Sequence, residues 1–230
     1  GESTDVLMDM AGPNPAILAP RGSAKSTVLG MLAAWMIGRH ATAGKMLRIL
    51  YLAYMTDISR AKSATIKALV GSAKYRQVFP KVRLSKIKRS DEYWSIDYDF
   101  AGIDTSGEEA FTIACGGLKG AITSKRSQLI IIDDPIKSAA SINNPDIRRE
   151  MESTWSNVIA PTMFQGGRAI CLGTRFHFDD IHATLFTPKY GWTQIVQQAV
   201  ITDNEGRQRS YWPDMWSMKY LNARKAEDRV

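Results

Sequence analysis

The 230-residue sequence contains only two cysteines, Cys115 and Cys171, and has no C-x-x-C motif or Cys/His cluster. Each cysteine lies in an apolar run typical of a buried strand, so we expect two free thiols in a reducing compartment and no structural zinc. No stretch approaches the ~20 apolar residues of a membrane span. The acidic start, GESTDVLMDM, also lacks the basic region of a signal peptide. These absences argue against a disulfide scaffold, a membrane protein and a secreted protein.

What the chain does contain is an ordinary globular composition with an excess of positive charge. Hydrophobic residues make up 44% and charged residues 23%, which fits one large α/β domain or one domain with a small appendage. The formal charge of +7 favours a polyanionic partner. Lysine and arginine are densest in KVRLSKIKR (81–89), which is either a solvated face or a nucleic-acid contact.

Apolar strand-like runs alternate with helical patterns along most of the chain. This alternation predicts a mostly parallel central sheet with helices on both faces. The predicted strands are 16–19, 47–55, 128–135 and 166–174; the predicted helices are 26–38, 57–72 (capped by Asp57), 145–163, 179–186 and 215–230. Shorter mixed segments between 75 and 125 predict an antiparallel meander inserted at the sheet edge, and 192–202 alternates like an edge strand.

The stretch AILAPRGSAKST (16–27) resembles a phosphate-binding loop but lacks both glycines of G-x-x-x-x-G-K-[ST], with Ala19 and Ala24 in their places. A loop between a buried strand and a helix directs backbone N–H groups at one anion. Lys25 would then contact the β- and γ-phosphates and Ser26 would ligate Mg²⁺. Ala24 can serve in this loop if its φ is negative in the bound form, because a positive φ strains a residue with a Cβ. The alternative is a plain strand–loop–helix.

In that alternative, Ser23 or Ser26 would serve only as the helix N-cap.

Two further strand ends carry polar residues. LIIIDD ends in Asp133, suited to the metal, and Asp134, suited to orient a water molecule; alternatively the two are a cap and a turn residue before a proline. CLGTRFHFDD places Thr174 where it could sense the γ-phosphate, unless it is only a turn residue. In the same segment His177 and His182 have no spacing that suits a metal-ligand pair.

Together these motifs, with YWPDMWSMKYLNARK near the end, resemble the N-terminal ATPase half of the large terminase subunit of tailed bacteriophages. The resemblance covers essentially the whole chain. It implies a RecA-like ASCE P-loop NTPase fold, with 1–230 as a single ATPase domain. Within it, 1–15 would be a lead-in, 75–125 an edge-strand insertion, and 190–230 a C-terminal strand and helix leading to an absent nuclease domain.

Carried over by residue, the resemblance makes Lys25 the Walker A lysine and Ser26 and Asp133 the Mg²⁺ partners. Asp134 stands where the family has its catalytic glutamate, with Glu150 in the following helix as the alternative. Thr174 falls in the coupling motif. The remaining ATP contacts would come from the loop, namely Arg21, Gly22, Ser23, Ala24 and Thr27.

The resemblance also places two arginines at the γ-phosphate. Arg21 could reach it in cis, and Arg126 could serve as a finger supplied in trans to a neighbouring subunit, with Lys125 as the weaker candidate. An ordinary exposed charge is the simpler interpretation of Arg126.

The function implied is a DNA-packaging motor that hydrolyses ATP with Mg²⁺. Its partners would be double-stranded DNA, the portal protein and the small terminase subunit, and it would work as a homo-oligomeric ring on the procapsid in the host cell cytoplasm. A DNA helicase or repair ATPase is an alternative, although no second phosphate loop follows residue 175. A second alternative is a module that binds a nucleotide or DNA without hydrolysing ATP.

Overall fold

The computed structural model describes residues 12–118, 120 and 125–227. The described residues form ten strands: β1 (Asn14–Leu18), β2 (Ile49–Ala53), β3 (Leu84–Arg89), β4 (Tyr93–Ile96), β5 (Ile113–Gly117), β6 (Ser127–Asp133), β7 (Met163–Gly173), β8 (Trp192–Val196), β9 (Val200–Thr202) and β10 (Gln208–Ser210). The first eight build one sheet in the order β3-β4-β5-β2-β6-β7-β1-β8, and β9 and β10 pair separately.

The sheet is parallel from β5 through β8, and only β3 and β4 run antiparallel to their neighbours. Its central strands are apolar along their length because helices cover both faces; Leu129 to Ile132 of β6 are each at most 1% exposed. The predicted mostly parallel α/β sheet is therefore confirmed.

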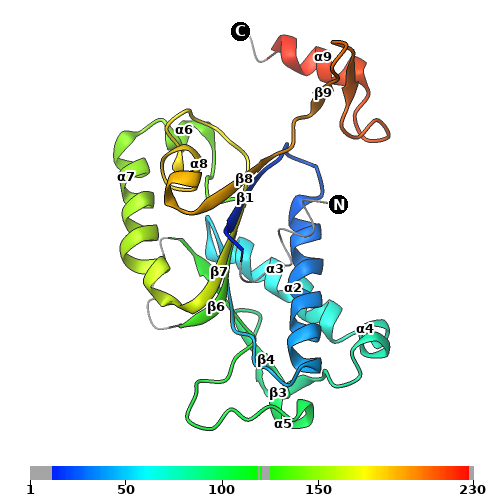
Figure 1. Ribbon diagram of the computed structural model, residues 1–230, viewed down its shortest axis with the longest axis vertical. Coiled ribbons are helices and arrows are strands. Elements are labelled where there is room, and N and C mark those ends of the chain that lie inside the picture. The colour runs from blue at the N-terminus through cyan, green and yellow to red at the C-terminus, as the bar shows by residue number, and fades with distance from the viewer. Residues whose placement is uncertain (1–11, 119, 121–124, 228–230) are drawn as a thin grey trace.

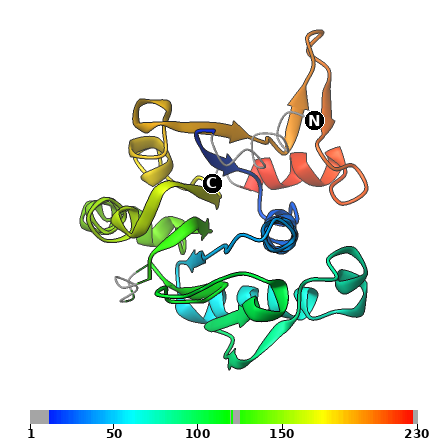
Figure 2. The same cartoon turned by 60° about the horizontal axis from the view of Figure 1, so that its bottom comes forward.

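Helices cover the two faces as the alternation predicts. The α-helices of the described ranges are α2 (Lys25–Thr42), α3 (Thr56–Val70), α4 (Ala73–Val78), α5 (Tyr98–Ala101), α6 (Ala139–Ile142), α7 (Pro145–Thr154), α8 (Ile181–Thr184) and α9 (Met218–Glu227), of which α9 lies apart from the sheet. One apolar core lies under α2 and α3, and a second lies under α7 and α8 on the opposite face (Figures 1 and 2). None of the helices in the described ranges is long and apolar enough to cross a membrane.

Two predicted features of the first helices are wrong. Helix α2 continues past Gly38 to Thr42, because Gly38 is a packing position: a Cβ there would lie 2.4 Å from the Phe79 ring. Asp57 does not cap α3, whose N-cap is Met55. Asp57 lies in the first turn instead and forms an ion pair with Arg60 at 3.1 Å.

The predicted helix 145–163 is interrupted after α7. A π-helical segment, Trp155–Ile159, and a 3-10 turn, Ala160–Thr162, lead into β7. Pro161 lies in that turn and cannot donate a helical hydrogen bond, so the chain cannot continue as an α-helix through this point.

The edge of the sheet differs from the antiparallel meander expected for 75–125. Strands β3 and β4 do form an antiparallel hairpin, but β5 pairs in parallel with β2. The third segment of the expected meander, 119–124, lies mostly outside the described residues, as do residues 1–11 of the expected lead-in.

The predicted single strand 192–202 is two strands. β8 adds to the sheet beside β1, and β9 forms a hairpin with β10 that projects with α9 from the body (Figures 1 and 2). The register with β1 ends where the Gln197 N–H donates to the Leu18 carbonyl, because β1 leads directly into the loop.

Candidate functional site

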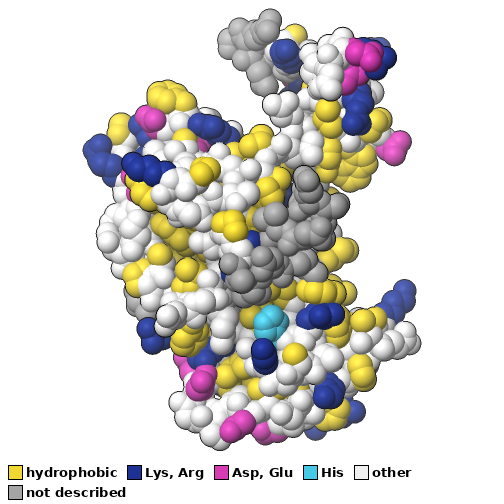
Figure 3. Space-filling model, in the orientation of Figure 1, with side chains coloured by type: hydrophobic (Ala, Val, Ile, Leu, Met, Phe, Trp, Pro, Cys, Tyr) yellow, Lys and Arg dark blue, Asp and Glu magenta, His cyan; other side chains and the backbone are white. Residues whose placement is uncertain are grey.

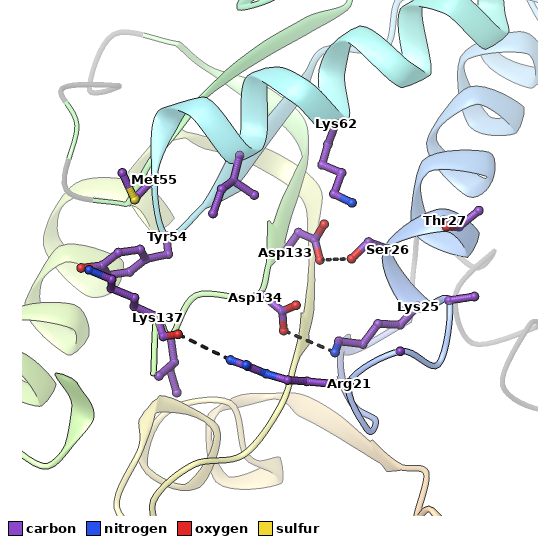
Figure 4. A pocket seen from close by; sticks show the side chains of 14 residues that line it. Arg21, Lys25, Ser26, Thr27, Tyr54, Met55, Lys62, Asp133, Asp134 and Lys137 are labelled. Atoms are coloured by element: carbon purple, nitrogen blue, oxygen red, sulfur yellow. Dashed lines mark hydrogen bonds and ion pairs between the residues drawn. The ribbon is translucent and has the colours of Figure 1, made fainter. Parts of the chain in front are cut away.

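A cavity of about 550 Å³ lies at the carboxyl ends of β1, β2 and β6. Three stretches line it: the loop and first turn of α2 between 21 and 27, the start of α3 between 54 and 62, and the segment 133–137 after β6 (Figure 4). This is the crevice in which open α/β sheets bind their ligands.

Ser26 and Asp133 meet on one side of the cavity. The Ser26 hydroxyl donates to Oδ1 of Asp133 at 2.9 Å, and the Tyr51 hydroxyl donates to Oδ2 at 2.8 Å. Burial raises the pKa of Asp133, and both hydrogen bonds oppose that rise. A serine oxygen beside a carboxylate oxygen is a donor set that suits Mg²⁺, so the residues present fit this metal.

Lys25 lies between Thr174, which follows β7, and Asp134, which follows β6. Its Nζ donates to Oγ1 of Thr174 at 3.0 Å and lies 3.5 Å from Oδ1 of Asp134. The lysine side chain is 8% exposed, whereas that of Asp134 is 46% exposed and faces the cavity (Figure 4). The Thr174 hydroxyl donates in turn to the Ala19 carbonyl at 3.3 Å. The structure thus brings together residues from three strand ends, as the motifs predict.

Two non-glycine residues of the site have positive φ. Ala24 has φ 56° and ψ 15°, the left-handed conformation that strains a residue with a Cβ: the turn into α2 needs a left-handed residue where the usual motif has glycine. Ala24 is also the N-cap, without a side-chain hydrogen bond, so neither Ser23 nor Ser26 caps the helix. Asp134 has φ 47°, and its N–H donates to the Leu172 carbonyl at 2.7 Å. Backbone strain of this kind gathers at functional sites.

Replacing Ala24 by glycine is expected to raise the free energy of unfolding by about 0.5–1 kcal/mol. The left-handed conformation costs a residue with a Cβ about 1–2 kcal/mol, and glycine avoids that cost. The larger conformational entropy of glycine in the unfolded chain offsets part of the gain. Urea unfolding measures the change. Ala43→Gly, at the C-cap of the same helix with φ −80°, is the matched control and should lower stability. Equal losses in both variants would contradict the assignment of strain to Ala24.

Three other loop residues differ in their placement. Arg21 lines the cavity, donates to the Lys137 carbonyl at 3.5 Å and lies over the Phe176 ring at 4.9 Å. Gly22 has φ 80° and faces Trp216, which a Cβ would approach to 3.2 Å. Ser23 does not line the cavity, and its hydroxyl is buried with no hydrogen-bond partner among the described residues.

Arg126 and Glu150 lie outside the cavity. Arg126 precedes β6 at the opposite end of the strand, with its guanidinium 5.5 Å from the centre of the Phe164 ring, and neighbouring Lys125 pairs with Glu109. Glu150, on α7, lines a different, small cavity with Pro135. Between the two candidate carboxylates, only Asp134 faces the cavity that holds Lys25.

Tyr51, Tyr54 and Lys62 are site residues that the sequence did not reveal. Tyr51 lies inside an apolar strand, and its role depends on the pairing of β2 with β6, which the sequence does not specify. Tyr54 and Lys62 line the cavity because α3 starts immediately after β2.

His182, from the segment after β7, is a packing residue. It is fully buried, and burial lowers its pKa to about 4. It lies so close to β7 that a Cβ on Gly173 would come within 2.5 Å of its Nε2.

No protein-family model matches the chain, and no curated protein matches it. Solved structures do. The large terminase of a thermophilic bacteriophage, in complex with ATP-γ-S, is 11% identical with a TM-score of 0.50, covering 89% of this chain and 45% of that one. The N-terminal domain of the DNA packaging ATPase from bacteriophage phi29 is 14% identical with a TM-score of 0.44, covering 89% of this chain and 91% of that one.

The chain therefore has the RecA-like fold of terminase ATPase domains. It spans less than half the length of the large terminase described above. At this identity the comparison establishes the fold. Function has to be argued from the residues of the cavity.

Proposed function

We propose that the chain is an ATP hydrolase that acts as the DNA-packaging motor of a tailed phage. The observation that carries the proposal is the composition of the cavity, where Lys25 and Ser26 at the N-terminus of α2 meet Asp133 and Asp134 at the end of β6. This arrangement suits phosphoryl transfer to water: it offers cationic groups for the phosphates, oxygen ligands for a metal, and a carboxylate for the water.

Each residue has a separate task in the proposed reaction. The N–H groups at the start of α2 and the Lys25 ammonium bind the phosphate chain. Ser26 and Asp133 would hold Mg²⁺, which neutralises charge on the phosphate oxygens when bound. Asp134 orients a water molecule; as the water oxygen bonds to the terminal phosphorus, the bond to the ADP oxygen breaks, and Asp134 accepts the water proton. Thr174 accepts a hydrogen bond from Lys25 and directly follows β7, so a shift of Lys25 on phosphate release would move the end of that strand.

The proposed partner of the motor is double-stranded DNA, contacted through its phosphates. The exposed cations of the 81–89 segment, Lys81, Arg83, Lys86 and Arg89, are the candidate contact; they lie on and just before β3, an edge strand of the sheet (Figure 1). Lysine and arginine side chains are otherwise scattered over the surface in view (Figure 3). The proposed working state is a ring on the procapsid, with the portal protein and the small terminase subunit, in the host cytoplasm.

An ATP turnover assay with and without double-stranded DNA tests the function. The proposal predicts Mg²⁺-dependent hydrolysis and DNA binding that is independent of sequence and weakens steeply as salt rises. ATP binding with no turnover at high protein concentration would favour a non-hydrolysing module instead. Strand separation by the isolated chain would favour a helicase.

A mixing experiment tests Arg126 as a finger in trans. Lys25→Ala protein has an intact Arg126 to donate, and Arg126→Ala protein has an intact cavity to receive it. The mixture is expected to regain part of the turnover that each variant lacks, since such a finger contributes about 10³–10⁵-fold in other phosphate-loop enzymes. If two folded, assembled variants regain nothing, Arg126 is only the cis packing partner of Phe164.

A further inference from the structure

Lys62 is a second lysine in the cavity, supplied by α3 and absent from the motifs of the loop. It projects from the helix toward Asp133 and Ser26 (Figure 4). Its side chain also borders a neighbouring space of about 240 Å³ between α2 and α3, together with Ile66 and Leu69. The lysine stem is thus placed against apolar neighbours while its ammonium is directed at the polar end of the site.

The donors of Lys62 are uncommitted. It makes no hydrogen bond or salt bridge with another described residue, whereas Lys25 contacts Thr174 and Asp134, and Arg21 contacts the Lys137 carbonyl. The Nζ of Lys137 lies 5.9 Å from the centre of the Tyr54 ring.

With Lys62 included, the charges that line the cavity balance those of a magnesium–nucleoside triphosphate complex. Among the described lining residues, the cations are Arg21, Lys25, Lys62 and Lys137 and the anions are Asp133 and Asp134, a net charge of +2. The magnesium complex of a nucleoside triphosphate carries roughly two net negative charges at neutral pH. Without Lys62 the net charge of the lining residues would be +1, one less than the charge of this complex.

Strand order indicates which phosphate Lys62 would meet. In the proposed site the phosphate chain would start at the loop after β1 and extend toward Asp134 at the end of β6. Since α3 follows β2, on the far side of β6 from β1, it borders the far end of that path. We infer that Lys62 binds the terminal phosphate of the nucleotide from α3, a role that rests on the proposed function.

Binding of Mg·ATPγS and Mg·ADP by titration calorimetry tests this role. Lys62→Met keeps the length and apolar stem of the side chain and removes its charge, so folding should be preserved. We expect its affinity for ATPγS to fall by about tenfold to a hundredfold, the loss that accompanies one charge-assisted hydrogen bond. Its affinity for ADP should change by no more than roughly threefold. Lys62→Arg should recover part of the ATPγS affinity, and Lys74→Met, at an exposed lysine of α4, is the matched control.

The outcomes separate this inference from the proposed function. Unchanged ATPγS affinity in Lys62→Met, a loss no larger than in the Lys74 control, or equal losses for ATPγS and ADP would each overturn the role of Lys62 while leaving the ATP site intact. A wild-type chain that binds neither nucleotide would overturn the proposed function itself. Thermal unfolding of every variant confirms that the comparison is made on folded protein.

Discussion

Replacing Lys25 by alanine is expected to reduce ATP turnover by about 10²–10³-fold, the loss typical of removing one preorganised charge from a transition state. The lysine ammonium lies at the centre of the site, between Thr174 and Asp134, on a side chain that is only 8% exposed. Its removal deletes a buried cation from the proposed phosphate site. Steady-state turnover with saturating Mg·ATP measures the effect.

Two further variants make the Lys25 result specific. Lys25→Arg keeps the charge but replaces a compact ammonium by a planar fork, so it should recover little activity in a buried position. Lys45→Ala, at an exposed lysine just beyond α2, should leave turnover unchanged. The Lys25→Ala protein could remain folded and retain more than about a third of wild-type turnover. Such a small loss is what removal of an exposed ion pair would cause, and it would mean that ATP is hydrolysed at another site.

Replacing Asp134 by asparagine is expected to lower turnover by about 10²–10⁴-fold, the usual contribution of a general base. Asparagine is nearly isosteric with aspartate and tolerates the positive φ of 47° at this position, so the backbone should be preserved. Affinity for Mg·ATPγS should change little or rise, because a negative charge near the phosphates is removed. Turnover and binding are therefore expected to separate in this variant.

Glu150→Gln is the matched comparison for Asp134→Asn, since both remove one carboxylate charge with little change in shape. Glu150 lines a different cavity under α7, so its amide variant should keep wild-type turnover. A strong loss in Glu150→Gln together with a mild one in Asp134→Asn would reverse the assignment. The contrast thus decides which carboxylate replaces the glutamate of the family that the sequence resembles.

The parallel core and the convergence of its strand ends were predictable from sequence because both depend on local patterns. Runs such as LIIID are apolar throughout only when helices cover both faces of a strand, and β6 is buried as expected. Carboxyl ends of parallel strands meet at one edge, so Lys25, Asp133, Asp134 and Thr174 could be expected to converge.

What the sequence could not supply depends on tertiary packing. A glycine such as Gly38 commonly ends a helix, but here it lies inside α2, where the Phe79 ring leaves no room for a Cβ. Ala24 is left-handed because the turn between β1 and α2 requires it, against the preference of alanine. Lys62 enters the site only through the placement of β2 beside β6, a pairing that no local pattern encodes.

The most direct test of the central claim is a crystal structure of the chain with Mg²⁺ and a non-hydrolysable ATP analogue. We expect the terminal phosphate beside Lys25, the metal ligated by Ser26 and Asp133, and a water molecule between Asp134 and the terminal phosphorus. A nucleotide bound outside the cavity of residues 21–27, 54–62 and 133–137, or a water held by Glu150, would contradict it.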